Sequence, residues 1–254
     1  MSTNLFDLTG KTALVTGGSR GLGREMVLAF AEAGADVMIV SRKIESCEAT
    51  AREVEALGRR AFPYACHVGH WGQVETMVEA AYAHFGRVDI LVNNAGLSPL
   101  YPSLDDISED LFDKVFSVNL KGPFRTSALI GKAMAKGEGG SIINVSSTAS
   151  AYPNKTTAPY GAAKAAVNHM TQSFAHEFGP KVRVNCIMPG PFATDIAAAW
   201  IDSEAFAQRA ADRIALQRAG QPNEIVGAAL YFASDASSFV TGMLFSVDGG
   251  WTAI

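Results

Sequence analysis

The sequence is poor in several features that mark whole classes of protein. Its three cysteines, Cys47, Cys66 and Cys186, are far apart and lack CxxC spacing, so neither a disulfide framework nor a zinc site is expected. No block of basic residues occurs and the net charge is −4, which argues against a nucleic acid as partner. The chain has no run of about 18 apolar residues, and no basic segment followed by an apolar one at its start. These absences predict a cytoplasmic protein without a membrane span. His67 and His70 are spaced to hold a metal, but no third ligand cluster accompanies them, so no metal is expected.

The chain of 254 residues alternates apolar, β-branched runs with longer stretches of helical pattern. Strands are expected at 11–17, 36–41, 60–66, 88–96, 140–147, 182–190 and 244–249. Helices are expected at 21–33, 45–57, 71–85, 108–136, 159–178 and 222–234, with Ser108 as an N-cap. Strands that are apolar throughout and separated by helices indicate a parallel sheet covered on both faces. With no linker and no repeat, the sequence predicts one α/β domain over residues 1–254, doubly wound, with about seven strands.

The first expected strand ends in TGGSRGLG, residues 16–23. Glycines at 17, 21 and 23 bracket the turn into the next helix, where backbone N–H groups can approach a ligand closely. The N-terminus of the following helix favours an anion. The segment therefore predicts a pyrophosphate cradle, with an ordinary tight turn as the alternative.

Further motifs follow along the chain: NNAG at 93–96, VNL at 118–120, two serines ahead of YGAAK, PG at 189–190 and VTG…VDGG at 240–250. Together with the Thr-Gly-x-x-x-Gly-x-Gly turn, this series resembles the short-chain dehydrogenase/reductase family in its compact form. The resemblance covers nearly the whole chain and includes the family's 3-oxoacyl-(acyl carrier protein) reductase-like members. It implies a Rossmann fold and an oxidoreductase that uses a nicotinamide cofactor.

The residues after the second strand favour NADP(H) as that cofactor. An NAD-preferring fold usually has an acid there for the ribose hydroxyls, whereas this chain has Ser41 followed by Arg42. A guanidinium suits a 2′-phosphate, and Arg20 in the glycine turn can point the same way; the alternative for Arg42 is a solvated charge. After the third strand His67 replaces the family's aspartate, and a neutral imidazole could still accept a hydrogen bond from adenine. Asn94 either touches the adenosine half or is purely structural.

The resemblance assigns a longer set of residues to the cofactor. It comprises Gly17, Ser19, Arg20, Gly21, Leu22, Gly23, Ser41, Arg42, His67, Val68, Asn94, Gly96, Tyr160, Lys164, Gly190, Phe192 and Thr194. In MPGPFATD, residues 188–195, Phe192 through its backbone and Thr194 through its hydroxyl resemble the family's clamp on the nicotinamide carboxamide, which implies pro-S hydride transfer.

Four residues form the expected catalytic set. Tyr160 and Lys164 lie one helical turn apart in TAPYGAAK, so an ammonium stands beside a phenol whose ordinary pKa of about 10 it should lower. Ser147, at the end of the fifth strand, has the family's spacing for its catalytic serine, and Ser146 is the alternative on the opposite face. Asn119, inside a long expected helix, resembles the family's fourth member, which holds a water against the lysine. The alternative is a surface Tyr–Lys contact.

The substrate is expected to meet Ser147, Tyr152, Tyr160, Pro191 and Trp200, under a lid formed by residues 191–216. The first part of that segment is apolar, and no basic residue occurs from 191 through 208. These features favour an uncharged, fairly apolar ketone or secondary alcohol. The alternative is that the apolar face of the segment packs on the body of the protein.

The sequence therefore predicts an NADP(H)-dependent oxidoreductase that interconverts a ketone and a secondary alcohol. One alternative is a 3-oxoacyl-(acyl carrier protein) reductase, for which Lys136 and Lys181, with Glu138 between them, are the candidate basic rim of the mouth. A non-catalytic NADP-binding sensor or scaffold is another. The expected partners are a small-molecule substrate and further copies of the chain, since helices that are apolar on more than one face predict a homotetramer.

Overall fold

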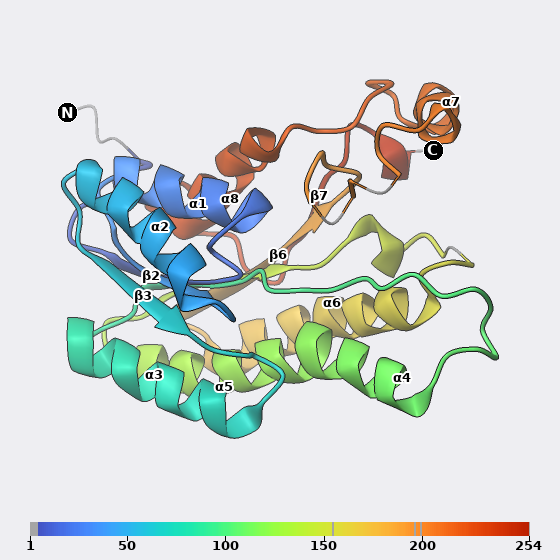
Figure 1. Ribbon diagram of the computed structural model, residues 1–254. Coiled ribbons are helices and arrows are strands. Elements are labelled where there is room, and N and C mark those ends of the chain that lie inside the picture. Colours follow the sequence, from blue (N-terminus) through green and yellow to red (C-terminus); the bar gives the residue numbers. More distant parts are fainter. Residues whose placement is uncertain (1–4, 154, 196, 199, 254) are drawn as a thin grey trace.

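The structure is a computed structural model that describes residues 5–153, 155–195, 197–198 and 200–253. Strands and helices alternate along the chain (Figure 1). The strands are β1 (Thr12–Thr16), β2 (Asp36–Ser41), β3 (Ala61–Ala65), β4 (Ile90–Asn93), β5 (Gly140–Val145), β6 (Val182–Pro189) and β7 (Leu244–Val247). The α-helices are α1 (Gly21–Glu32), α2 (Ile44–Ala56), α3 (Trp71–Phe85), α4 (Glu109–Phe116), α5 (Gly122–Lys136), α6 (Ala158–Phe178), α7 (Glu204–Arg213) and α8 (Val226–Ala233).

The strands form one parallel sheet of seven in the order β3-β2-β1-β4-β5-β6-β7. On β1, Thr16 lies opposite Val40 of β2 on one side and Asn93 of β4 on the other. The strand order thus reverses direction at β1, and in such sheets a ligand crevice opens beyond the carboxyl ends of the strands at this point. The predicted doubly wound α/β fold is confirmed.

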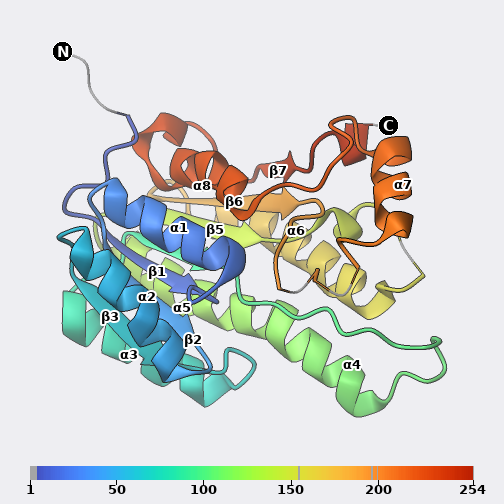
Figure 2. The same cartoon turned by 45° about the horizontal axis from the view of Figure 1, so that its top comes forward.

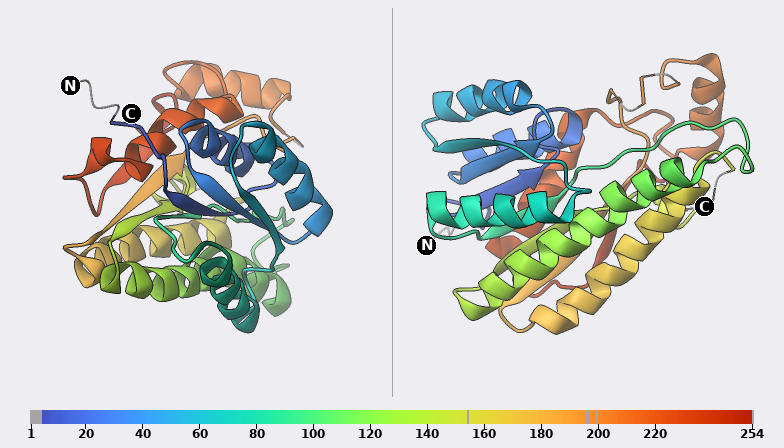
Figure 3. Two further views of the ribbon diagram at one scale, coloured as in Figure 1. Left: turned by 90° about the vertical axis from the view of Figure 1, so that its left-hand side faces the viewer. Right: turned by 60° about the horizontal axis from the view of Figure 1, so that its bottom comes forward.

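Helices cover both faces of this sheet. One face packs against α1, α2 and α8, and the other against α3, α5 and α6 (Figures 1 and 2). Along β1, Ala13 and Val15 enter the first core while Leu14 enters the second, because successive side chains of a strand point to opposite faces. The views in Figure 3 show the sheet between the two helical layers. None of the described helices is both long and apolar enough to cross a membrane.

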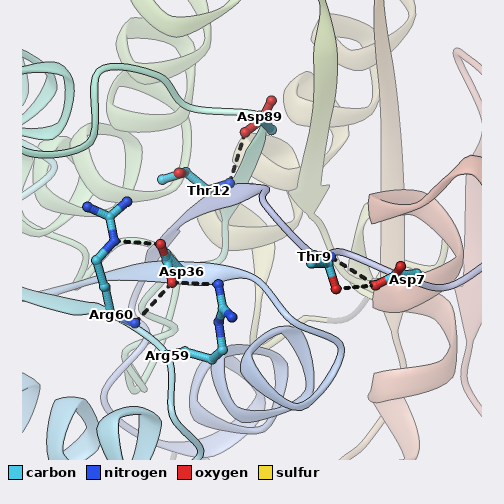
Figure 4. Close-up of polar contacts among 7 residues, drawn as sticks. All are labelled: Asp7, Thr9, Thr12, Asp36, Arg59, Arg60 and Asp89. Carbon is cyan, nitrogen blue, oxygen red and sulfur yellow. Dashed lines mark hydrogen bonds and ion pairs between the residues drawn. The ribbon is translucent and has the colours of Figure 1, made fainter.

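Charged groups hold the amino ends of the strands, at the edge opposite the crevice (Figure 4). Asp36, at the start of β2, accepts hydrogen bonds from Arg59 at 2.9 Å and from Arg60 Nε at 2.7 Å. Burial raises the pKa of Asp36, but the hydrogen bonds and charges of the two arginines outweigh it, so the pKa lies below its ordinary value. Asp89, just before β4, accepts the backbone N–H of Thr12 at 2.9 Å. These contacts tie β2 to the start of β3, and β1 to the start of β4.

Some segments differ from their expected form. The helix expected at 108–136 forms α4 and α5 with a π-helical turn between them, η1 (Ser117–Lys121), in which Gly122 N–H donates to the carbonyl of Ser117. Its predicted cap is confirmed, because Ser108 accepts the N–H of Leu111 at 3.2 Å. Residues 204–213, assigned only to a lid, form the helix α7. The helix expected at 222–234 begins as a 3₁₀ turn, η3 (Pro222–Ile225).

Candidate active site

A cleft of about 810 Å³ opens beyond the carboxyl ends of the strands. Its wall consists of the segments that follow β1 to β6, together with α7 and residues near the C-terminal end. Every residue predicted to bind cofactor or substrate lines this cleft. Of the four predicted catalytic residues, Ser147, Tyr160 and Lys164 line it, whereas Asn119 is fully buried behind it.

The glycine turn after β1 is shaped by close backbone packing. Gly17 has a φ of +68°, in the left-handed region, and a side chain at Gly23 would place its Cβ only 2.1 Å from the carbonyl oxygen of Gly17. Asn94 Nδ2 donates to the carbonyls of Thr16 at 3.0 Å and Gly17 at 3.1 Å. The side-chain amide of Asn94 therefore stabilises the turn. The N-cap residue of α1, Arg20, makes no capping hydrogen bond with its side chain. The first N–H groups of α1 are therefore open to an anion, and the turn fits a pyrophosphate.

The end of the cleft near β2 carries Ser41, which is half-buried, and Arg42, which is exposed. Arg20 instead forms an ion pair with Asp195 at 3.5 Å, in the loop after β6. That loop lies on the other side of β1 from Ser41, so in this structure the guanidinium of Arg20 points toward the loop after β6. Both members of the pair are mostly exposed, and such a pair contributes little, so Arg20 can still exchange it for a phosphate.

His67 differs from its expected hydrogen-bonding role. Its Nδ1 accepts the backbone N–H of Gly69 at 3.2 Å, which assigns the proton of the neutral ring to Nε2. Burial lowers the pKa of His67, and the charges of His70 and Arg42 lower it further, so the neutral form prevails at pH 7. His67 therefore presents a donor to the cleft. Because Nδ1 already accepts this bond, the expected hydrogen bond from adenine to the imidazole stays a prediction.

Tyr160 and Lys164 extend from the first turns of α6 to the end of the cleft near β5 and β6. Lys164 is 3% exposed, its Nζ donates to the carbonyl of Val145 at 2.7 Å, and burial lowers its pKa from 10.5 to about 8. Its Nζ lies 5.7 Å from the centre of the Tyr160 ring. Burial raises the pKa of Tyr160, and a hydrogen bond with Ser147 only partly offsets this. The net shift of the Tyr160 pKa is therefore upward, whereas the effect of Lys164 alone was expected to lower it.

Ser147 stands beside the phenol and caps a short 3₁₀ turn, η2 (Thr148–Ser150). Its Oγ accepts the N–H of Ala149 at 3.1 Å, and its hydroxyl also hydrogen-bonds Tyr160 on the wall of the cleft. The neighbouring Ser146 is buried and its hydroxyl donates to the carbonyl of Lys164 at 3.0 Å. The geometry therefore favours Ser147 over Ser146 as the reacting serine.

Asn119 supports the site from behind. Its Oδ1 accepts the N–H of Leu97 at 3.2 Å, and its Nδ2 donates to the carbonyls of Leu97 at 2.8 Å and Val115 at 2.9 Å. A Cβ on Gly96 would lie 3.0 Å from Asn119 Oδ1 and 3.6 Å from Lys164 Nζ, so Gly96 is packed between the two side chains. With its amide fully bonded to backbone, Asn119 positions the segment after β4 and does not reach the cleft itself.

The loop after β6 pairs with Gly220 through backbone hydrogen bonds. Ala193 N–H donates to the carbonyl of Gly220 at 2.9 Å, and Gly220 N–H donates to that of Pro191 at 2.9 Å. In this parallel pairing the backbone N–H of Phe192 points away from Gly220, which is the orientation expected of a backbone clamp. Thr194 lies beside it on the cleft.

The end of the cleft near β5 and β6, called the substrate end below, contains residues that the sequence analysis did not assign to the substrate. Tyr152, Pro191 and Trp200, which were predicted to meet the substrate, line the cleft, and so do Phe206 and Arg209 of α7 and Trp251. The stretch without basic residues stops at 208, one position short of Arg209. An amphipathic reading of 204–213, with Phe206 and Ala210 buried, could have found α7 and its flanking arginine.

Two further expectations concern a metal site and a basic rim. The rings of His67 and His70 lie 4.5 Å apart, and among the described residues no group of three or more His, Cys, Asp or Glu side chains gathers around them or elsewhere. Lys136 ends α5 and Lys181 precedes β6, so both lie at the amino ends of the strands, with Glu138. Their assignment to the mouth is wrong, because the cleft opens at the opposite edge of the sheet.

An uncapped helix behind a glycine turn, with a half-buried tyrosine and a buried lysine at the far end of the same cleft, is what a dinucleotide-dependent oxidoreductase of the Rossmann type requires. Comparison with known proteins agrees: a family model described as enoyl-(acyl carrier protein) reductase matches residues 17–252. The chain is 37% identical to the 3-oxoacyl-[acyl-carrier-protein] reductase of Thermotoga maritima, over 96% of this chain and 98% of that protein. It belongs to the short-chain dehydrogenase/reductase family.

Two solved structures show how closely the fold is shared. A gluconate 5-dehydrogenase from Burkholderia cenocepacia, in complex with NADP and tartrate, superposes with a TM-score of 0.93 at 35% identity over 99% of each chain. A 7α-hydroxysteroid dehydrogenase, complexed with NADH and 7-oxo glycochenodeoxycholic acid, gives a TM-score of 0.93 at 32% identity, over 98% of this chain and 97% of that one. Proteins with this fold therefore bind either NADP or NADH.

Proposed function

We propose that the protein is an NADP(H)-dependent enzyme that interconverts a ketone and a secondary alcohol. The observation that carries the proposal is the position of Tyr160. Its phenol lies in the same cleft as the open N-terminus of α1, beside Ser147 and above Lys164. Relatives named for their activities on sugar acids, steroids and 3-oxoacyl groups support the same type of reaction.

The residues of the cleft fit a nicotinamide dinucleotide. The glycine turn and the first N–H groups of α1 would hold the pyrophosphate, since a Cβ at Gly23 would fill the space that the turn needs. Ser41 and Arg42 would hold a 2′-phosphate, because no carboxylate stands at the end of β2 to repel it. When bound, the reduced cofactor supplies a hydride to the carbonyl carbon. The backbone of Phe192 and the hydroxyl of Thr194 would orient its carboxamide.

The chain's own side chains handle the carbonyl oxygen. The Ser147 hydroxyl donates a hydrogen bond to that oxygen and polarises the carbonyl. Tyr160 then donates its phenol proton to the same oxygen; its raised pKa keeps the phenol protonated at neutral pH, as a general acid requires. The Lys164 ammonium favours the phenolate left behind. In the oxidation direction the same groups remove the proton of the alcohol.

The Tyr160→Phe variant tests this assignment. It should bind NADPH like the wild type and lose turnover of a ketone panel by about 10²- to 10⁴-fold, the usual contribution of general acid catalysis. Tyr64→Phe is the matched control, since Tyr64 lies on the edge strand β3 and does not line the cleft. Turnover by Tyr160→Phe within about twofold of wild type would overturn the proposal. A wild-type protein that binds NADPH but reduces nothing in the panel would favour a sensor or scaffold.

Reduction of a 3-oxoacyl group on a carrier protein is the second candidate, favoured by the Thermotoga maritima relative and by the matched family model. The two candidates are separated by kinetics. An enzyme for carrier-bound substrates should have a much higher kcat/KM for an acetoacetyl group on acyl carrier protein than for the same group as a free thioester. Equal values would leave the small-molecule ketone as the substrate.

A further inference from the structure

Arg209 occupies a position on α7 that the proposed chemistry does not use. It lies three residues after Phe206, so the two side chains share one side of the helix. Phe206 is 6% exposed, packs against Trp200 with ring centres 5.2 Å apart, and lines the cleft with it. This packing fixes the side of α7 that faces the cleft, and Arg209, which is exposed, is among the residues that line it. In Figures 1 and 2, α7 lies at the opposite end of the molecule from α2, which follows the Ser41 end of the cleft.

The charges around the cleft leave Arg209 available. Among the described residues that line the cleft, Asp195 is the one acid, and it is paired with Arg20. Arg209 forms no ion pair within the described part of the chain, and Asp212, on the next turn of α7, accepts a hydrogen bond from Gln208. Of the other described cations that line the cleft, Arg42 and Lys43 follow β2, Arg20 pairs with Asp195, and Lys164 donates to the carbonyl of Val145. The substrate end therefore offers a single cation with no partner of its own.

We infer that Arg209 binds a carboxylate on the substrate, so that the enzyme acts on keto acids and hydroxy acids whose carboxylate is separated from the reacting carbon by an apolar chain. The inference rests on the proposed function and names its substrate class. A planar guanidinium pairs with a carboxylate through two parallel hydrogen bonds. One arginine balances the single charge of a carboxylate, whereas a phosphate monoester carries nearly two. The residues that line the same cleft include Trp200, Phe206 and Trp251, whose apolar rings suit the hydrocarbon part of such a substrate.

The first arm of the test is kinetic and uses levulinate, its methyl ester and the keto acid one methylene longer. Arg209→Leu should raise KM for the acids by about tenfold, the value of a charge-assisted bond that stays partly in contact with water. KM for the ester and the Kd for NADPH should stay unchanged, and Arg209→Lys should fall between. Arg213→Leu removes the same charge from the same helix without touching the cleft, and should leave all these values unchanged.

Ionic strength gives a readout that a purely structural role would not move. The wild-type KM for levulinate should rise with added salt, while that of Arg209→Leu should not, because salt screens a partly exposed charge pair. If Arg209→Leu leaves the ratio of acid to ester kcat/KM unaltered, the inference fails while the proposed function stands.

The second arm needs no turnover. Levulinate is titrated into the NADP⁺ complex, which cannot reduce it, and binding is followed by calorimetry for the wild type, Arg209→Leu and Arg213→Leu. Weaker binding in Arg209→Leu alone supports the carboxylate site even if no ketone is ever reduced, in which case only the proposed function fails. Equal binding by all three proteins, or none by the wild type, overturns the inference.

Discussion

Replacing Gly23 by alanine should disrupt the turn that holds the nucleotide. The new Cβ would lie 2.1 Å from the carbonyl oxygen of Gly17 and 2.5 Å from Asn94 Nδ2, and neither atom can move freely. The carbonyl belongs to the backbone, and the amide is fixed by its bonds to Thr16 at 3.0 Å and Gly17 at 3.1 Å. The turn must therefore open, which displaces the N–H groups at the start of α1.

The cost can be estimated from these contacts. Forcing one methyl group into a packed site costs about 1–3 kcal/mol. Breaking the two Asn94 hydrogen bonds adds about 0.5–1.5 kcal/mol each, so the free energy of unfolding should fall by about 2–6 kcal/mol. That is a large share of the stability of an ordinary domain, about 5–15 kcal/mol. Affinity for NADPH should also fall, since the displaced N–H groups are those proposed to meet the pyrophosphate.

Urea unfolding followed by circular dichroism, together with fluorescence titration of NADPH, measures both effects. Gly72→Ala is the matched control: Gly72 lies in α3, its added Cβ meets nothing within 4 Å, and the change should stabilise the helix by up to about 1 kcal/mol. A Gly23→Ala protein whose stability is within about 0.5 kcal/mol of wild type, with unchanged NADPH affinity, would refute the reasoning.

Two further predictions concern the charged groups of the cleft. Because burial lowers the pKa of Lys164 to about 8 while that of Tyr160 is raised, rising pH removes the ammonium before it removes the phenol proton. The kcat/KM for ketone reduction should therefore fall about tenfold between pH 7 and pH 9. Lys164→Arg should move this limb to higher pH, and a limb that does not move would exclude Lys164 as its cause. Separately, Arg42→Ala should weaken NADPH binding by about 10- to 100-fold in calorimetry and leave NADH binding unchanged, because only NADPH carries the 2′-phosphate. An equal loss for both cofactors would show that Arg42 does not read that phosphate.

Much of the fold could be predicted because the strands are buried on both faces. Runs such as TALVT and DVMIVS have unbroken apolar centres, ALV and VMIV, and glycines mark where several helices end, as Gly86 does after α3. The parallel direction of the strands then follows from the alternation of strand and helix. The glycine turn and the Tyr160–Lys164 spacing could also be recognised in the sequence, since both are local patterns with a direct chemical reason.

The features that the sequence did not reveal depend on contacts between distant segments. The position of Arg209 at the cleft depends on how Phe206 packs against Trp200, which no local period encodes. The donor state of His67 depends on a bond from Gly69 to its Nδ1. Similarly, Arg20 turns toward Asp195 only because the loop after β6 folds back beside the glycine turn. In each case the residue could be noted in the sequence. The contact that determines its role is made with another segment or another atom, and it can be found only in the folded structure.

Asn119 shows how such a partner changes the meaning of a motif. Its chain segment leaves the α-helical path at η1, where Gly122 N–H bonds to Ser117 five residues back, and the amide of Asn119 bonds the backbone of Leu97 and Val115. The helix is thereby tied to the segment after β4, and Gly96 in that segment packs between Asn119 and Lys164. A change at Asn119 would therefore act on the ammonium through Gly96, without touching a ligand. The four residues that the sequence groups as one catalytic set divide in the structure into three that face the cleft and one that positions them.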